Sequence, residues 1–450
     1  MLIPRVNKTK TFEVSPHQWV IAGFAFIICI GALILASPIA SSTGESIGFL
    51  NAFFTSTSAV CVTGLTVLDT GQDFSIFGQI IIMVLIQIGG LGFMTFGVIV
   101  AIILGKKLGL RQRLIIQEST KSTSIQGLIR LSLHIFMIAF IFEAIASVIL
   151  SIRWVEDLGL KNAIYYAVFH SISSFNNAGF ALWSDSLSRY VGDPTVNIVI
   201  TLLFIVGGIG FTVIIDIYNK RMWHTLSLNS KIVIISTTVL SLVGFLIIFI
   251  LELINPAIFG TLSWGEKLWA AFFQGLTPRT AGFNTIDISS MLEASQFFII
   301  FLMFIGASSG STGGGIKTNT LVVLILAVLS SIKGRDEIHI FNRRIANEYI
   351  QRALAIIMIS LGVVLFVSFL LTITEDHLKH DFIEFLFEAT SAFGTVGLTM
   401  GLTTDLTIPG KIIIMLTMFI GRLGPLTLAF ALSQKKTSKV SYAEEKILIG

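Results

Sequence analysis

Charged residues are scarce in this chain. Asp, Glu, Lys and Arg together make up 12% of its 450 residues, whereas soluble domains carry about 25%. This deficit excludes an ordinary soluble globular protein. Long apolar runs such as "IVIISTTVLSLVGFLIIFILELI" (232–254) stand in place of the missing charge. Runs of this length predict a polytopic membrane protein with an all-α fold.

Cysteine and histidine are also rare. The two cysteines, Cys29 and Cys61, stand far apart, so neither a disulfide framework nor a cysteine metal cluster is expected. His134, His170 and His377 are scattered, and the sequence predicts no histidine pair at metal spacing. No phosphate-binding glycine loop or aspartyl-phosphate motif occurs. The sequence therefore predicts no enzyme, no resident cofactor and no ATP-driven pump.

The chain carries a modest basic excess, with a formal net charge of +4. Basic charge on a membrane protein is typical of cytoplasmic loops, so we do not expect a nucleic-acid partner. The N-terminus "MLIPRVNKTK" is basic as well. The apolar segment that follows from Trp19 is too long for the core of a cleavable signal, and no small-residue cleavage pattern follows it.

Four short apolar stretches, too short to cross a membrane, lie between longer ones. Each ends in a similar phrase in which a glycine precedes a bulky apolar residue. The stretches are 47–60, 162–175, 265–277 and 382–393, and their phrases are "TSAVCVTGLT", "SISSFNNAGFA", "FQGLTPRTAGFNT" and "TSAFGTVGLT". The recurring glycines are Gly64, Gly179, Gly282 and Gly397.

A second mark follows each phrase at a nearly constant distance. It reads "IGGLGF", "VGGIGF", "IGASSG" and "IGRLGP" along the chain. Paired marks at constant spacing indicate four tandem units of span, re-entrant helix, glycine loop and span. We expect eight transmembrane helices around one pseudo-fourfold pore. The predicted units are 1–115, 116–228, 229–345 and 346–450, the third with a broken second span and the fourth ending in a cytoplasmic tail.

Lysine and arginine predict the orientation. If the N-terminus is inside, the tails and the loops after each second span hold 21 of the 30 basic residues. This bias predicts a cell-membrane protein with both termini in the cytoplasm and with glycine loops that enter from outside.

Non-helical backbone survives at membrane depth only where it is buried or lines water. Glycine tolerates positive φ, which lets carbonyl groups turn toward a common axis, and a ring of carbonyls can replace the hydration shell of a cation. A single such glycine could simply cap a helix, but four in register favour a filter. Ser58, Ser174, Thr277 and Thr390 on the short helices are expected to hold these loops through hydroxyl hydrogen bonds.

On these motifs, "NNAGF", "PRTAGFNT" and "GSTGGGIKT" above all, the whole chain resembles the Trk/Ktr/HKT superfamily of cation transporters, most closely the Ktr-type bacterial potassium uptake subunits. The resemblance implies potassium ions at filter carbonyls. Thr66, Ala181, Asn284 and Thr399 replace the second glycine of potassium channels, which implies a shorter filter. The filter residues are Val62, Thr63, Gly64, Asn177, Ala178, Gly179, Thr280, Ala281, Gly282, Thr395, Val396 and Gly397.

In the third unit the second mark becomes "GASSGSTGGGIKT" (306–318), whereas in the first two units it continues as an apolar run that predicts an intact helix. Each helical glycine costs about 1 kcal/mol relative to alanine, so we expect a mobile loop below the filter, and the resemblance implies a gate there. A packed helix crossing is the alternative. The gate residues are Gly306, Ala307, Ser308, Ser309, Gly310, Ser311, Thr312, Gly313, Gly314, Gly315, Lys317 and Arg422.

Arg422 stands in "FIGRLGPL", at a depth matching Ala307. A charge at membrane depth is expensive and usually functional, so we expect Arg422 to bond to the loop and obstruct the path. Capping of carbonyls freed by Pro425 is the alternative. Lys317 is placed toward the cytoplasmic mouth. Glu143 and Asp216 are expected to be interhelical hydrogen bonders or to lie at the lipid edge.

The sequence thus predicts potassium uptake through a gated, channel-like pore. A sodium-selective or sodium/potassium cotransporting member of the superfamily is one alternative. The resemblance associates serine at the first filter glycine with sodium in some plant relatives, and Gly64 argues against it. A secondary carrier with alternating access is the other alternative, although the units run parallel and are not inverted. The resemblance also implies a homodimer and a cytosolic ring of nucleotide-binding subunits, docked on 105–130, 333–352 and the tail "SYAEEKILIG".

Overall fold

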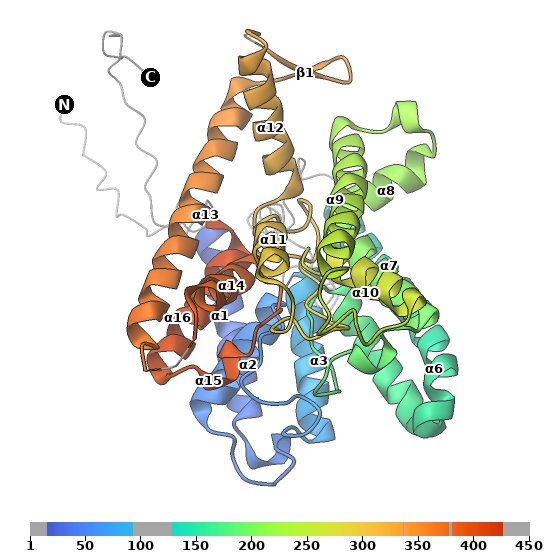
Figure 1. Cartoon of the computed structure of the whole chain (residues 1–450), viewed down its shortest axis with the longest axis vertical. Coiled ribbons are helices and arrows are strands. Elements are labelled where there is room, and N and C mark those ends of the chain that lie inside the picture. The colour runs from blue at the N-terminus through green and yellow to red at the C-terminus, as the bar shows by residue number, and fades with distance from the viewer. Residues whose placement is uncertain (1–15, 93–127, 336, 378–379, 426–450) are drawn as a thin grey trace, which may run out of the picture.

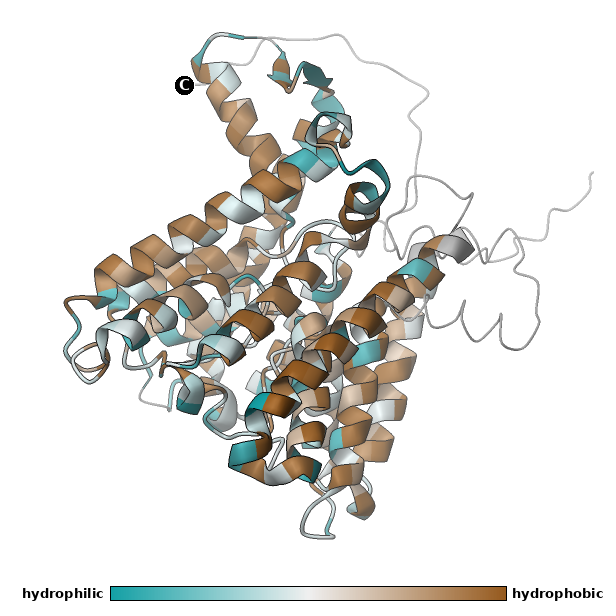
Figure 2. Ribbon diagram, turned by 90° about the vertical axis from the view of Figure 1, so that its right-hand side faces the viewer, coloured by the Kyte–Doolittle hydropathy of each residue, from teal (hydrophilic) through white to brown (hydrophobic). Residues whose placement is uncertain are grey.

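The computed structural model describes residues 16–92, 128–335, 337–377 and 380–425. Figure 1 shows helices gathered around a set of central loops. Large apolar side chains such as Phe26, Phe140 and Ile250 lie exposed on the outer helices. Figure 2 shows much of the helical ribbon in the colour of hydrophobic residues. Among the described residues, four helices can cross a membrane by length and composition, and a bent pair makes a fifth. This is the composition of a multi-pass membrane protein.

The helices follow the predicted alternation of long and short. The first half contains α1 (Pro16–Leu35), the 3₁₀ turn η1 (Pro38–Ala40), α2 (Phe49–Cys61), α3 (Ile76–Leu91), α6 (Leu128–Phe175), η2 (Ser188–Tyr190), α7 (Pro194–Ile209), α8 (Phe211–Lys220) and η3 (Trp223–Thr225). The second half contains α9 (Leu228–Glu252), α10 (Trp264–Leu276), α11 (Glu293–Phe304), α12 (Thr318–Ile332), α13 (Asn347–Thr374), α14 (Phe382–Gly394), α15 (Leu402–Asp405) and α16 (Ile408–Leu423).

The short re-entrant helices fall close to the predicted stretches. Helices α2, α10 and α14 match three of them within two residues at each end. The fourth is the end of α6, in which Gly159 leaves the helical conformation (φ 73°) and separates a long helix from a shorter one that ends at Phe175. Glycine makes this break inexpensive because positive φ brings no Cβ clash.

Hydroxyl and carboxylate caps fix where three of the four helices after the glycine loops begin. The Ser75 hydroxyl accepts from Gly78 N at the start of α3, and the Thr407 hydroxyl accepts from Gly410 N at the start of α16. Asp193 accepts from two backbone amides at the start of α7. These caps satisfy amides that no helical turn can pair.

The prediction of an intact helix after the filter loop is wrong for the second unit. Helix α7 ends at Ile209, Gly210 takes φ 101°, and α8 leaves at 92° to α7. In the first unit α3 ends at Leu91, with φ 81° at Gly92, and its continuation lies outside the described residues. Helix α16 also ends before a positive-φ glycine, Gly424. In three of the four marks, a glycine before Phe or Pro therefore ends a helix.

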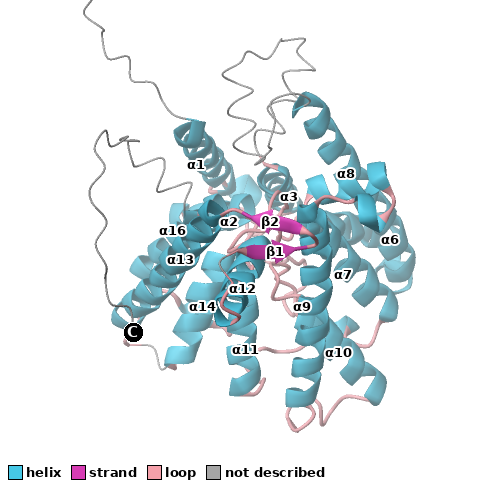
Figure 3. Ribbon diagram, turned by 90° about the horizontal axis from the view of Figure 1, so that it is seen from above, coloured by secondary structure: helices cyan, strands magenta, loops and turns pink. Residues whose placement is uncertain are grey.

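Contacts between the units close the chain into a ring. Helix α3 packs on α6, α7 on α10, α11 on α14, and α16 returns to α2. Figure 3, seen from above, shows the helices surrounding loops at the centre. The short helices supply much of the core, including the fully buried Phe54, Phe273 and Phe387. The boundary expected at 115/116 lies outside the described residues.

A small hairpin departs from the all-α expectation. Strand β1 (Ile338–Ile340) pairs antiparallel with β2 (Arg343–Ile345) and stands between α12 and α13. Figure 1 shows it at the tip of these two helices. Phe341 and Asn342 form the turn, both with positive φ. Two central residues of that kind match the twist of paired strands.

Candidate functional site

The four predicted filter loops share one backbone conformation. Their glycines have positive φ, as do the residues two positions earlier. These φ values are +90° at Gly64, +70° at Gly179, +79° at Gly282 and +92° at Gly397, preceded by Val62, Asn177, Thr280 and Thr395 at +49° to +69°. Positive φ in a non-glycine residue costs on the order of 1–3 kcal/mol and persists where the surroundings determine it, often at functional sites.

The four glycines lie next to one another in a closed ring. A Cβ built on Gly64 would stand 3.0 Å from Gly179 Cα, and one on Gly179 would stand 2.9 Å from Gly282 Cα. The ring continues from Gly282 to Gly397 at 3.4 Å and from Gly397 back to Gly64 at 3.0 Å. A side chain at any of these positions would therefore strike the backbone of the neighbouring loop.

Carbonyl oxygens accompany this ring. The atoms that a Cβ would meet include one carbonyl oxygen from the next loop in each case, always that of the residue before the glycine. These carbonyls belong to Thr63, Ala178, Ala281 and Val396. The C-terminal ends of the short helices, which carry partial negative charge, lead into the same loops. Such an arrangement of dipoles suits a monovalent cation.

Hydroxyl groups on the short helices hold the loops, although not always the predicted ones. The Ser58 hydroxyl accepts from Gly64 N at 3.0 Å, and Thr277 donates to Phe283 O at 2.6 Å, as expected. The expectations for Ser174 and Thr390 are wrong. Thr390 bonds to its own helix and Ser174 has no partner. Their neighbours take the role: Ser173 donates to Phe180 O, and Ser391 accepts from Gly397 N.

A cavity of about 150 Å³ opens on one side of the glycine ring. All four glycines line it, together with Asp69 and Thr70. Its wall also includes the four residues that replace the second glycine of the channel pattern, Thr66, Ala181, Asn284 and Thr399. Wide space directly beyond the glycines fits the expectation of a short filter.

The stretch "GASSGSTGGGIK" (306–317) is a loop between α11 and α12, not a helix. Ile305 and Ile316 form a parallel bridge at its neck. Its backbone is paired with the second unit: Ser308 N donates to Gly208 O at 2.9 Å, and Phe211 N donates to Gly310 O at 3.0 Å. The packed-helix alternative is therefore wrong.

Two hydrogen bonds tie this gate loop directly to the filter loops. The Thr312 hydroxyl donates to Asn177 Oδ1 at 2.9 Å, and Gly314 N donates to Thr395 Oγ1 at 3.0 Å. Asn177 in turn donates to Thr280 Oγ1 at 3.2 Å. The side chains of three filter residues thus face the gate loop, a role that the carbonyl-based prediction missed.

Arg422 meets the gate loop, as expected. Its guanidinium donates to Thr312 O on the loop and to Gly89 O and Gly90 O on α3. The alternative role, in which Arg422 caps carbonyls freed by Pro425, is wrong, because its donors go to these three carbonyls instead. The arginine joins the fourth unit to the third and the first. Lys317 lies at the exit of the loop and donates to Gly313 O at 2.6 Å and to Gly314 O at 3.2 Å.

Glu143 and Asp216 are hydrogen bonders between segments, as predicted. Glu143 on α6 accepts from Gln87 on α3 at 3.0 Å and from Asn176 at 3.2 Å. Asp216 on α8 accepts from Ser227 N and from the Ser230 hydroxyl at 2.6 Å. Neither side chain belongs to the predicted filter or gate residues.

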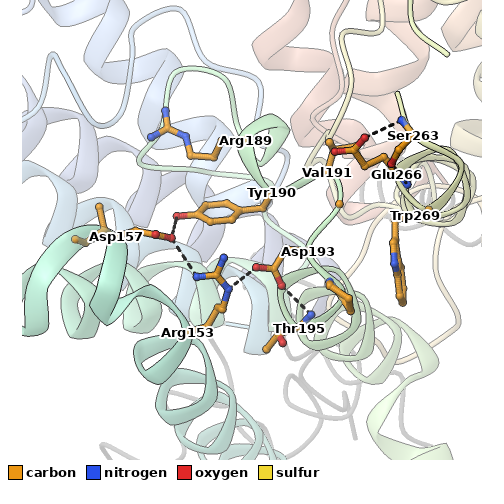
Figure 4. Close-up of a pocket in the computed structure, with 14 residues that line it drawn as sticks. Arg153, Asp157, Arg189, Tyr190, Val191, Asp193, Thr195, Ser263, Glu266 and Trp269 are labelled. Atoms are coloured by element: carbon orange, nitrogen blue, oxygen red, sulfur yellow. Dashed lines mark hydrogen bonds and ion pairs between the residues drawn. The ribbon is translucent and has the colours of Figure 1, made fainter. Parts of the chain in front are cut away.

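A second, polar cavity of about 990 Å³ lies between the second and third units (Figure 4). Three of its charged groups pair with each other: Arg153 bonds to Asp193 at 2.5 Å and to Asp157 at 3.2 Å. Burial and the Asp157 carboxylate raise the pKa of Tyr190 to about 12. These paired groups all belong to the second unit, and among the described residues no group of His, Cys, Asp and Glu is arranged for a metal ion.

Comparison with known proteins gives a concordant result. The family model described as "TrkH: Cation transport protein" matches residues 7–441. Over its full length the chain is 47% identical to the Ktr system potassium uptake protein B of Bacillus subtilis (strain 168), and 100% of that protein is covered. Over 99% of both chains it is 39% identical to the potassium/sodium uptake protein NtpJ of Enterococcus hirae.

A solved structure supports the fold. The crystal structure of the potassium transporter TrkH from Vibrio parahaemolyticus superposes with a TM-score of 0.73 at 18% identity. The match covers 95% of this chain and 87% of that one.

Proposed function

The chain belongs to the TrkH family of cation transport proteins, and from this premise we propose that it takes up potassium across the cell membrane through a channel-like pore. It is a multi-pass membrane transporter and not an enzyme. The proposed cation path begins in the cavity bounded by Thr66 and Asn284, passes the glycine ring and meets the gate loop below it.

One observation carries this proposal: four glycines from four loops meet in one closed ring, each beside a carbonyl oxygen of the next loop. The proposed filter is the twelve residues predicted from sequence, and potassium ions are the substrate at their carbonyls. The names of the relatives, potassium uptake protein B among them, support the same substrate.

We propose that residues 306–317 and Arg422 form the gate. The loop is hydrogen-bonded to Asn177 and Thr395 at the filter, and Arg422 holds Thr312 O. A cation leaving the filter would meet these groups. The gate must therefore move for ions to pass, and its glycines provide the backbone freedom that movement requires.

The finer architecture belongs to the same proposal. We place eight spans in four parallel units around a pseudo-fourfold axis, with the boundaries predicted above and both termini in the cytoplasm. The resemblance favours a homodimer and a cytosolic nucleotide-binding ring. Of the three proposed docking segments, only 333–352 lies largely within the described residues, and its hairpin exposes Arg343 and Arg344.

Flux through purified protein tests the proposal. In proteoliposomes that contain only this chain, potassium and rubidium uptake should exceed sodium uptake. Gly282→Ser is the critical variant, because its Cβ would stand 2.8 Å from Gly179 Cα at a φ of 79°. We expect the variant to lose preference for potassium. Gly265→Ala is a matched control, since nothing lies within 4 Å of the added Cβ. Equal selectivity in wild type and Gly282→Ser would remove this ring from the filter.

A sodium/potassium transporter is the second candidate, because a relative 39% identical over nearly the whole chain bears the name potassium/sodium uptake protein. Saturable sodium uptake that potassium does not suppress would favour it. For a carrier with alternating access, the discriminating measurement is electrical. Unitary current steps in a planar bilayer support a pore, and their absence from a variant without the gate loop would favour a carrier.

A further inference from the structure

Glu388 is a fully buried carboxylate on the short helix α14, and neither the filter nor the gate accounts for it. Both of its oxygens accept hydrogen bonds from hydroxyl groups. Thr399 Oγ1 donates to Oε2 at 2.8 Å, and Thr403 Oγ1 donates to Oε1. Within the described part of the chain, no basic side chain forms an ion pair with Glu388. A buried charge is unfavourable unless hydrogen bonds compensate it. We therefore asked which part of the structure these two hydrogen bonds hold in place.

The position of Thr399 shows what the carboxylate supports. Thr399 lies two residues after Gly397 and lines the cavity beside the glycine ring. Its hydroxyl also accepts from Gly401 N at 3.1 Å and lies 3.1 Å from Thr403 Oγ1. Glu388 therefore fastens the chain that leaves the fourth filter loop back onto the helix that enters it.

The position of Glu388 can be compared with the equivalent position in each of the other three units. The residue nine positions before each filter glycine is Thr55, His170, Phe273 or Glu388. His170 Nε2 accepts from Leu182 N at 3.3 Å, just beyond the second filter loop. Thr55 bonds only to a carbonyl of its own helix, Asn51 O, and Phe273 is apolar. At this position the second and fourth units, whose loops are not neighbours in the ring, therefore have a side-chain hydrogen bond to the chain beyond the filter loop. The first and third units lack such a bond at this position.

We propose that Glu388 is a positioning residue for potassium selectivity, which it supports by holding Thr399 and so fixing the backbone of the fourth filter loop. His170 serves the second loop in the same way. The inference rests on the proposed potassium function. The carboxylate does not touch the ion; it acts through the threonine hydroxyls. A hydroxyl left without its acceptor would turn, and the Gly397 segment would gain freedom to accept a smaller cation.

The test compares Glu388→Ala and Glu388→Gln with Thr55→Val, the control at the same position of the first unit. Potassium and sodium uptake are measured in proteoliposomes, together with the potassium concentration that gives half-maximal thermal stabilisation of the detergent-solubilised protein. For Glu388→Ala we expect about a tenfold loss of potassium over sodium preference, which corresponds to 1.4 kcal/mol. The half-maximal potassium concentration should rise as well. Glu388→Gln keeps one acceptor oxygen and should lie between Glu388→Ala and wild type, whereas Thr55→Val should match wild type.

A merely structural role predicts something different: Glu388→Ala would then melt at lower temperature in every salt, with unchanged preference and unchanged half-maximal potassium concentration. That result overturns the inference, as does an equal change in Thr55→Val. If Glu388→Ala does not fold, Glu388→Gln decides, since wild-type preference in it overturns the inference. Adding Glu388→Ala to a Thr399→Val, Thr403→Val background should cause no further loss. Failure of wild type itself to prefer potassium would instead refute the proposed function.

Discussion

Removing the arginine that contacts the gate loop should open the pore. Arg422→Ala deletes one charge-assisted hydrogen bond to the loop, at Thr312 O, and two contacts to α3. A hydrogen bond to a charged group contributes roughly 1.5–3 kcal/mol. If that bond exists only with the loop closed, its loss raises the ratio of open to closed pores about 10- to 150-fold.

Rubidium uptake into liposomes that contain only this chain measures the effect. Flux per protein should rise in Arg422→Ala, and it should rise further when Ser309 to Gly314 are deleted. The deletion also removes the bonds from Thr312 to Asn177 and from Gly314 to Thr395. Potassium preference should survive in both variants, because the glycine ring is unchanged.

Two further variants separate a latch from an electrostatic barrier. Arg422→Lys keeps the positive charge but loses the forked set of donors, so a latch predicts intermediate flux and a barrier predicts wild-type flux. Combining Arg422→Ala with the deletion should add nothing, since both act on the same closed loop. Flux in Arg422→Ala at or below that of wild type, in protein that elutes as a single folded species, refutes the latch.

Three more outcomes are expected. Thr395→Val leaves Gly314 N without its acceptor, which costs roughly 1–3 kcal/mol in the closed state. Rubidium flux should therefore rise by at least several-fold, and unchanged flux would show that this bond does not couple the filter loop to the gate loop. Gly210→Ala places a Cβ 2.8 Å from Ser309 O at a φ of 101°, so flux should rise while potassium preference is kept, and a wild-type rate would show that the bend tolerates a side chain. Gly64→Ser should reduce potassium preference as Gly282→Ser does, measured as the ratio of potassium to sodium uptake, because both glycines belong to one ring.

Local pattern was enough to predict the short helices and the glycine loops. An apolar stretch that ends in a positive-φ glycine carries its information within about a dozen residues, and four copies reinforce each other. The gate loop could also be predicted from the sequence, since Gly313, Gly314 and Gly315 together make a helix too unfavourable. These features depend little on distant contacts.

The bend at Gly210 could not be read in this way. A single glycine in an apolar run costs only about 1 kcal/mol as helix, so the pattern predicts a continuous span. The break is stabilised by the gate loop, whose Gly310 O accepts from Phe211 N. That partner lies a hundred residues later in the chain. The signal was nonetheless present, as a glycine before Phe or Pro in three of the four marks.

The hydroxyl assignments failed for a geometric reason. Successive helical residues point about 100° apart, because the helix has 3.6 residues per turn. Ser173 faces the filter loop and Ser174 does not, and choosing between them requires the exact end of the helix. Glu388 was missed for a related reason, since its partner Thr403 lies beyond the filter in a segment that no repeat marks.

The gate loop continues directly into α12, and this gives the molecule a lever. Helix α12 has 15 residues, which makes it roughly 22 Å long, and its far end carries the β1–β2 hairpin at the tip of the structure (Figure 1). Tilting such an arm by about 10° moves its end by about 4 Å. A protein bound to the hairpin could therefore use α12 as a lever arm, so that a small force at the hairpin produces a larger force at Thr318, where the arm meets the loop. Because α12 begins where the gate loop ends, the motion reaches the loop first.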